Sequence, residues 1–100
     1  MSFRDKVEAD RRLIILRLLI ENGGAGSESL LERGLLDLGE RVNLHRAEVR
    51  RFIRELEEKT CVVVDLFQDK LMVAQITKHG VAVAEGRVTV DGVAKPSLGV

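Results

Sequence analysis

The longest apolar run of the chain, Leu13–Ile20, lies near the N-terminus and is interrupted only by Arg17. Seven apolar residues in eight positions cover more than one face of a helix, so this segment must be surrounded on several sides. The Asn22–Gly24 segment then supplies left-handed stop signals. The pattern predicts a first helix over residues 3–22. This helix is either the centre of a small domain or buries one face in a second copy of the chain.

A second helix is predicted after the flexible, glycine-rich segment 23–26. Ser27 can cap its N-terminus by accepting a hydrogen bond from a free backbone N–H, and Gly39 can end it. Its apolar stripe consists of Leu30, Leu31, Leu35 and Leu38. A short connector, Glu40–Val42, leads to a third helical segment. Two helices joined in this way have the outline of a helix-turn-helix, and an ordinary helical hairpin is the alternative.

The third helical segment, Asn43–Thr60, has two different faces. Its apolar face spans an arc of roughly 100° and consists of Val49, Phe52, Ile53 and Leu56. A separate arc of about 140° carries Arg46, Arg50, Arg51 and Arg54. Asn43 can cap the N-terminus, which predicts that the helix begins at Leu44 or His45.

The charges of this helix run against its macrodipole. Its N-terminal part holds four arginines against the single Glu48, whereas three glutamates and one lysine occupy its C-terminal end. Helices favour the opposite order, so intrinsic stability does not explain this one. A phosphate-bearing partner does, because guanidinium groups bind phosphates and the guanine edge. The alternative is a solvated face on which Arg50 pairs with Glu57, or Arg54 with Glu58.

From Cys61 onward the sequence pattern changes from that of helices to that of strands. The segments Cys61–Phe67 and Leu71–Ile76 are rich in β-branched and apolar residues, which predicts two strands. The short polar segment 68–70 between them predicts a tight antiparallel hairpin, although it lacks the glycine that usually favours such turns.

The last predicted helix is short and covers residues 78–85, with Thr77 as its cap and Gly86 at its end. Gly80 is unfavourable inside a helix, which predicts close packing at this position. Residues 87–100 are expected to form an extended C-terminal tail beside a domain of residues 1–86. The apolar residues of this tail pack either along the domain or across a dimer partner.

Composition narrows the choice of function. One hundred residues suffice for one small domain, and the 45% hydrophobic fraction favours a packed core. Sixteen basic and sixteen acidic residues give a net charge of +0, which argues against a strong non-specific nucleic-acid binder. Any DNA contact must therefore come from a local basic patch. Because a domain of this size buries a modest fraction of its surface, we expect a homodimer.

Further candidate chemistry is sparse. The lone Cys61 and the highly charged N-terminus predict a cytoplasmic protein without a signal peptide or membrane contact. His45, His79 and Cys61 do not have the spacing of a zinc site, and no phosphate-binding loop or nucleophile elbow occurs. We therefore expect no metal, cofactor, small-molecule substrate or catalytic residue, and no enzyme activity.

The order of elements carries a family resemblance. The third helix ends in Glu55–Lys59, a hairpin follows at once, and Ile76–Gly80 comes next. This order resembles bacterial winged-helix regulators of the ArsR and MarR type, in which a Leu-Thr-x-x-Gly turn often follows the hairpin. The whole chain, including Gly80–Gly86 and Gly92–Pro96, is similar to a family of small winged-helix proteins of Mu-like phages and prophages. The resemblance implies an α+β fold, a winged helix-turn-helix of three helices followed by a β-hairpin wing and a short C-terminal helix.

By this resemblance residues 44–59 form the recognition helix for the DNA major groove, and residues 61–76 form the wing. The implied contacts with double-stranded DNA are made by Asn43, His45, Arg46, Arg50, Arg51, Arg54 and Lys70. In a homodimer, two recognition helices about 34 Å apart read a palindromic site. The implied function is that of a phage-derived transcriptional regulator or a DNA accessory factor.

A second interpretation is a protein-protein interaction module that docks its arginine face on an acidic partner during phage development, without DNA binding. The neutral charge and the short wing, which offers only Lys70, favour it. Arg51 and Arg54 then form surface salt bridges, and Asn43 acts only as a helix cap.

Overall fold

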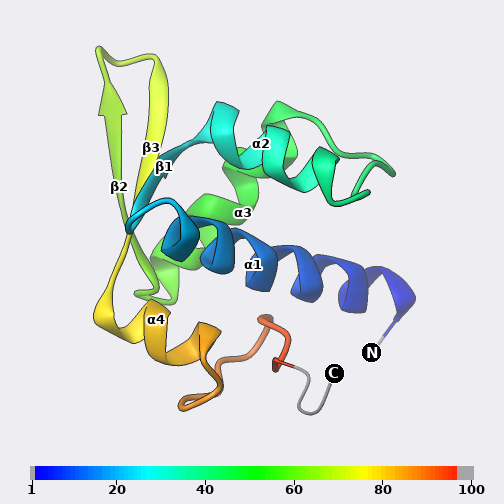
Figure 1. Ribbon diagram of the computed structural model, residues 1–100. Coiled ribbons are helices and arrows are strands. Elements are labelled where there is room, and N and C mark those ends of the chain that lie inside the picture. The colour runs from blue at the N-terminus through cyan, green and yellow to red at the C-terminus, as the bar shows by residue number, and fades with distance from the viewer. Residues whose placement is uncertain (1, 97–100) are drawn as a thin grey trace.

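A small sheet stands beside a group of helices in the computed structural model, which describes residues 2–96 (Figure 1). The helices are α1 (Phe3–Glu21), α2 (Glu28–Asp37), α3 (Arg46–Glu58) and α4 (Lys78–Ala84). The strands are β1 (Ala25–Ser27), β2 (Val62–Phe67) and β3 (Leu71–Ile76). These elements confirm the α+β class predicted from the sequence.

The sheet is antiparallel, with the strand order β1-β3-β2. β2 and β3 pair from Val62 opposite Ile76 to Phe67 opposite Leu71, which confirms the predicted hairpin. β1 corrects the prediction of a flexible linker over residues 23–26, because this short strand pairs with β3. A three-residue strand next to glycines is too short to show an alternating pattern in the sequence.

The hairpin turn is closed without glycine. Gln68 and Asp69 adopt φ angles of 53° and 57°. The Lys70 N–H donates to the Phe67 carbonyl at 3.0 Å. Positive φ at two successive residues gives the backbone twist that matches antiparallel strands, but side chains other than glycine and asparagine disfavour it. The tip of the hairpin therefore carries backbone strain.

Side-chain caps fix the starts of three helices, and two of these caps were predicted from the sequence. Ser27 accepts a hydrogen bond from the Leu30 N–H at 3.1 Å, which confirms it as the cap of α2. Thr77 caps α4 in the same way, as predicted. α2 ends at Asp37. The predicted leucine stripe is only partly right, because Leu31 and Leu35 are buried whereas Leu30 and Leu38 are exposed.

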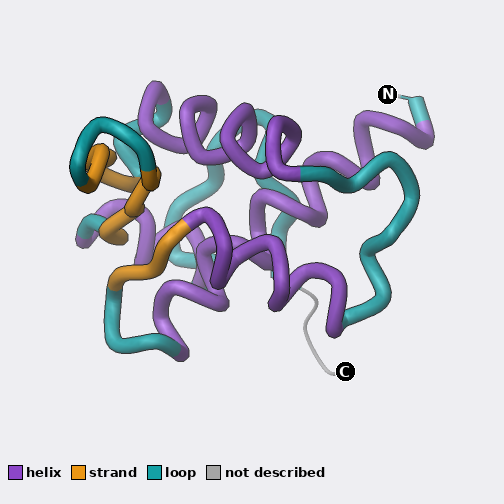
Figure 2. The backbone as a smooth tube through the Cα atoms, turned by 90° about the horizontal axis from the view of Figure 1, so that it is seen from above, coloured by secondary structure: helices purple, strands orange, loops and turns teal. Residues whose placement is uncertain are grey.

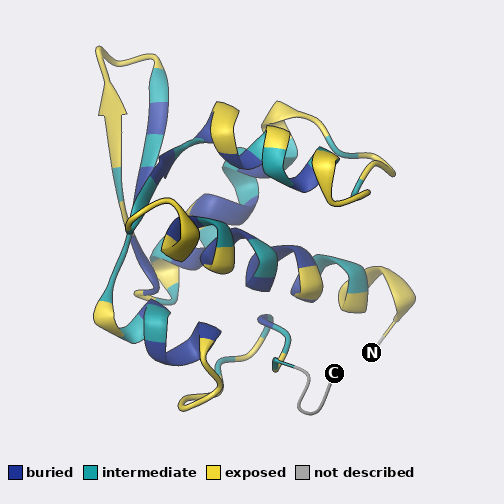
Figure 3. Cartoon of the chain, viewed as in Figure 1, coloured by how far each residue is buried: buried dark blue, intermediate teal, exposed yellow. Residues whose placement is uncertain are grey.

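The core surrounds α1, which packs against α2, α3, α4, β1 and β3. This arrangement covers the long apolar run on several sides, as its composition predicts. Dark blue segments on the facing sides of the helices mark the core in Figure 3. Its largest fully buried apolar side chains are Phe52, Ile15, Leu16, Leu19, Leu31, Leu35, Ile53, Leu56 and Val49.

α4 packs closely on the start of β2. A Cβ atom at Gly80 would collide with the backbone carbonyl oxygen of Cys61. The predicted close packing at Gly80 is therefore confirmed. It explains why glycine stands inside a helix, where it costs about 1 kcal/mol relative to alanine.

The segment after α4 returns along α1 (Figure 1). The Ala94 N–H donates to the Ala9 carbonyl at 3.1 Å, and Val93 is buried in the core. Of the two alternatives for its apolar residues, packing along the domain is the one seen at Val93. Residues 97–100 of the expected tail lie outside the described residues.

Candidate nucleic-acid interface

α3 presents its arginines on faces that the core leaves open. The apolar face is buried as predicted, with Val49, Phe52, Ile53 and Leu56 fully inaccessible. Arg46, Arg50 and Arg54 follow one another at intervals of four residues, so they form one ridge along the helix, here called the arginine ridge. Arg51 leaves the helix on another side, toward α1.

The start of α3 differs from the prediction. Its cap residue is His45, whose side chain makes no capping hydrogen bond, and the helix begins at Arg46. Asn43 lies two residues earlier in a turn, where it adopts a φ of 54° and the Leu44 N–H donates to the Arg41 carbonyl at 3.2 Å. The prediction that Asn43 caps α3 is therefore wrong. Asparagine tolerates the left-handed conformation better than most residues, which accounts for its place in the turn.

Arg50 connects three elements. Its Nε and Nη2 atoms donate to the two carboxylate oxygens of Glu28 in α2, at 2.7 and 2.8 Å. The same Nη2 donates to the Lys70 carbonyl at the hairpin tip, at 2.6 Å. The predicted alternative pairing of Arg50 with Glu57 is wrong, because this bidentate contact occupies the guanidinium. Arg50 thus holds α2, α3 and the hairpin in one arrangement.

Glu28 is a buried carboxylate with only 1% of its surface exposed. Besides Arg50, it accepts a hydrogen bond from the Met72 N–H at 2.6 Å. Ser27 is paired with Val73, so Glu28 follows β1 and satisfies the N–H that a longer β1 would have bonded. Hydrogen bonds from Arg50 outweigh the opposing effect of burial and lower the pKa of Glu28. The carboxylate therefore remains charged at neutral pH.

The two ends of the arginine ridge make looser contacts. Arg46 pairs with Glu32 at 2.9 Å and more distantly with Glu28 at 3.8 Å. Arg54 pairs with Glu57 at 2.9 Å rather than with the predicted Glu58. Their side chains are 46% and 48% exposed. Exposed ion pairs contribute about 0–1 kcal/mol, so these two guanidinium groups can exchange partners.

Arg51 belongs to the packing of α3 against α1. It donates to Glu48 at 2.6 Å, to Glu8 of α1 at 2.9 Å and to Glu55 at 3.0 Å. Its guanidinium carbon lies 4.7 Å from the ring centre of Phe52. The hydrogen bond with Glu48 is the largest of the effects that raise the pKa of Arg51. The same hydrogen bond lowers the pKa of Glu48.

Two buried arginines of α1 complete this side of the molecule. Arg12 pairs with Glu55 at 2.9 Å and donates to the Gly92 carbonyl at 2.7 Å, which ties the C-terminal segment to the helices. Arg11 pairs with Glu40 and donates to the Val42 carbonyl at 2.8 Å, which holds the connection between α2 and α3. Sequence reasoning missed both residues. Their burial could have been inferred from their positions, which directly precede the long apolar run of a helix that is surrounded on several sides.

The structure therefore divides the predicted DNA contacts. The arginine ridge and the backbone of Lys70 come together, and Asn43 and His45 are exposed just before the ridge. Arg51 lies apart, within the contact between α1 and α3. Each of the four α3 arginines has at least one carboxylate partner, which leaves little unbalanced positive charge on this surface.

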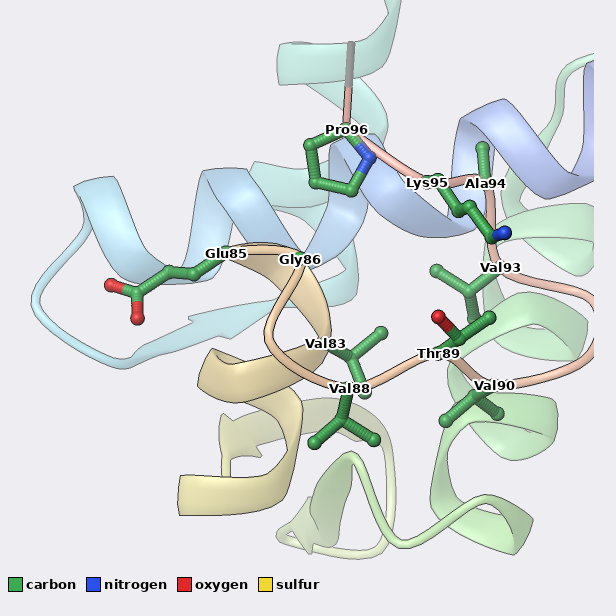
Figure 4. A pocket seen from close by; sticks show the side chains of 10 residues that line it. All are labelled: Val83, Glu85, Gly86, Val88, Thr89, Val90, Val93, Ala94, Lys95 and Pro96. Atoms are coloured by element: carbon green, nitrogen blue, oxygen red, sulfur yellow. The ribbon is translucent and has the colours of Figure 1, made fainter. Parts of the chain in front are cut away.

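Two of the hollows on the surface lie at the N-terminal and C-terminal parts of the chain. A groove of about 570 Å³ between the N-terminal part of α1 and the α2–α3 connection is lined by Phe3, Val7 and Val42, among others. Figure 2 shows this connection arching from the end of α2 to the start of α3. The second hollow, of about 300 Å³, lies between α4 and the C-terminal segment. Valines line much of it, and Glu85 points away from them (Figure 4).

Neither a metal cluster nor a membrane-spanning helix occurs in the described part of the chain. Within residues 2–96, no group of three or more His, Cys, Asp or Glu side chains is placed to hold a metal ion. No helix in these residues has the length and apolar character to cross a bilayer.

The chain has relatives among phage and bacterial proteins. It is 38% identical over 92 residues to a protein of Escherichia phage Mu named "Uncharacterized protein gp26", which covers 92% of this chain and 93% of the phage protein. The chain belongs to the family of phage Mu gp26. An "Uncharacterized protein" of Haemophilus influenzae is 36% identical over 79 residues, or 79% of this chain and 76% of that protein.

Membership of the gp26 family confirms the predicted relationship to Mu-like phages. No family model matches the chain, and no solved structure matches it significantly.

Proposed function

We propose that this protein is a winged helix-turn-helix DNA-binding protein of a Mu-like phage or prophage. In this proposal α2 and α3 form the helix-turn-helix, α3 is the recognition helix, and the β2–β3 hairpin is the wing. The observation that supports it most is the position of Arg50, which contacts Glu28 of α2 and the Lys70 carbonyl of the hairpin. The helix ridge and the hairpin tip are thereby held together as one surface, as a protein that reads a groove and its flanking backbone requires.

The arginines of α3 would have different tasks on DNA. Arg46 and Arg54 are the phosphate or base contacts, because the nearest partner of each forms a weak surface pair that a phosphate can replace. Arg50 and Arg51 are positioning residues, because their carboxylate partners hold α3 against α2 and α1. Lys70 extends the basic surface at the hairpin tip.

The paired state of the ridge sets the strength of binding. Phosphates must displace Glu32 and Glu57 from their arginines, so binding is modest and decreases steeply with salt. Weak binding of this kind fits a regulator or an accessory factor of which several copies bind together at one DNA site.

A selection from a random duplex library tests the proposal. Wild-type protein should enrich particular duplexes, and the Arg46→Glu/Arg54→Glu double variant should not bind them. The matched control reverses two exposed lysines outside the ridge, Lys6→Glu and Lys78→Glu, with the same change in net charge. Enrichment by the wild type that persists in the ridge variant, or no enrichment at all, rejects the proposal.

The second candidate function is a protein-protein interaction module without DNA binding. The neutralised arginines favour it, as does the groove beside the exposed apolar residues Phe3 and Val42. A pull-down from a nuclease-treated phage lysate distinguishes the two functions. Recovery of a phage protein by the wild type, with no duplex enriched in the selection, would support the interaction module.

A further inference from the structure

The outer edge of β2 is an open strand edge. β2 lies at the end of the sheet, next to β3 only. The Phe67 carbonyl accepts the Lys70 N–H and the Cys61 carbonyl accepts the Thr77 N–H, each at 3.0 Å, so odd-numbered residues direct their backbone groups toward β3. Because these groups alternate along a strand, Val64 and Leu66 direct theirs outward.

This edge has few of the features that usually protect edge strands. β2 contains no proline, lysine, glycine or bulge within Val62–Phe67. Three of its apolar side chains are exposed: Val63 by 59%, Leu66 by 41% and Phe67 by 61%. Figure 3 shows the exposed half of β2 toward the hairpin tip. Its one charge, on Asp65, lies in the middle of the exposed stretch.

We propose that the β2 edge pairs with β2 of a second copy of the chain, antiparallel and around a twofold axis at Asp65. In this register Val64 lies opposite Leu66 of the partner subunit on the inner face. Val63 lies opposite Phe67 of the partner subunit on the outer face. The two sheets then join into one continuous six-stranded sheet.

The register follows from which residues are accessible. Directly opposed residues of antiparallel strands lie on the same face, so a twofold axis must pass between two copies of one residue. An axis at Val64 would use Val62, which is 2% exposed, and would oppose Val63 to a carboxylate. An axis at Leu66 would require Gln68, which belongs to the turn. Only the axis at Asp65 opposes every accessible apolar side chain of the strand to another.

A second copy fits this edge because the edge is complementary to itself. The net charge of +0 gives no overall repulsion between copies. The core is complete within one chain, so the pairing adds a small interface of the weak or transient class. The two Asp65 carboxylates oppose each other in water, where such a repulsion amounts to about 1 kcal/mol. The dimer therefore forms with rising concentration. It uses none of the ridge arginines, so its formation can be measured without DNA.

Sedimentation equilibrium over a range of concentrations tests the pairing. Wild-type mass should rise toward twice the monomer mass, whereas Leu66→Lys should stay monomeric because it places a charge on the edge. Val64→Pro should do the same, since it removes an outward N–H that the fold of one chain does not use. Val42→Lys, at an exposed apolar site away from the sheet, is the matched control and should dimerise like wild type. A monomeric wild type, or a dimer that survives both edge changes, overturns the proposal.

Two further measurements identify the partner strand and the register. An equal mixture of wild type and the Asp65→Lys variant should associate at least tenfold more tightly than either alone, because opposite charges then meet at the axis. With oxidised glutathione, Asp65→Cys should cross-link to itself, because opposed residues at this type of pair have Cα atoms about 4.5 Å apart, within disulfide range. Phe67→Cys should not cross-link to itself, because it lies opposite Val63 of the partner subunit. Equal association in the mixture, or equal cross-linking of the two cysteine variants, contradicts the assigned register.

Discussion

The guanidinium of Arg50 binds both carboxylate oxygens of Glu28, at 2.7 and 2.8 Å, although 22 residues separate the two in the chain. Glu28 is almost completely buried and also receives the Met72 N–H. One side-chain pair thus fixes the position of α3 relative to α2 and the hairpin. The arrangement of the proposed DNA-binding surface depends on it.

Glu28→Gln should therefore lower the free energy of unfolding by about 2 kcal/mol, because charge-assisted hydrogen bonds are lost in a buried site. The measurement is urea denaturation followed by circular dichroism. Glu32→Gln is the control, because its pair with the half-exposed Arg46 should contribute less than about 1 kcal/mol. Equal losses for the two variants would contradict the role given to Glu28.

The same pair predicts a pH dependence of stability. The pKa of Glu28 is lowered in the folded state from its ordinary value of 4.5, first because of the hydrogen bonds from Arg50. The stabilisation is therefore complete above pH 4.5 and is lost as the pH falls through the lower, folded-state pKa. The free energy of unfolding of wild type should fall in this range more steeply than that of Glu28→Gln. Parallel curves for the two proteins would show that another carboxylate dominates.

The strained hairpin tip offers a stabilising change. Gln68 and Asp69 both have positive φ. Replacing them with Asn-Gly, the pair that suits such turns, should raise the free energy of unfolding by about 1–2 kcal/mol. Thermal denaturation measures the gain. Lys70→Gly, at a residue without positive φ, should give no gain, and equal stabilisation by both changes would refute the strain argument.

Gly80 allows a test in which two effects have opposite signs. Helix propensity alone predicts that Gly80→Ala stabilises α4 by about 1 kcal/mol. The contact with the Cys61 carbonyl predicts instead a loss of about 1–3 kcal/mol, because the added methyl group has no space. Chemical denaturation decides between them, and a stabilised variant would show that α4 shifts without cost.

Local sequence patterns predicted the parts of this fold that depend on neighbouring residues. The buried face of α3 and the β2–β3 hairpin were predictable because periods of 3.6 and 2 are visible within one element. The caps Ser27 and Thr77 were predictable because a polar residue directly precedes each helix. Gly80 was predictable as a site of close packing because glycine otherwise disfavours a helix.

Contacts between distant segments were not predictable in this way. Glu28 stands in a polar, helix-starting context, and its burial follows only from β1, which is too short to be visible in the sequence. From the sequence, the alternative to a phosphate-bearing partner for Arg50 was therefore the nearby Glu57. Asn43 was misassigned as a cap because a residue that favours caps also favours left-handed turns.

The affinity for a selected DNA duplex, measured by fluorescence anisotropy at several salt concentrations, tests the proposed function most directly. Glu32→Gln/Glu57→Gln removes the nearest carboxylate from each of Arg46 and Arg54 and should bind more tightly than wild type at low salt. Arg46→Glu/Arg54→Glu should lose binding, and wild-type log affinity should decrease with log salt by about 0.9 for each phosphate contacted. No binding by any of the three proteins, or equal binding by all of them, would contradict the proposal that the arginine ridge is a DNA-binding surface.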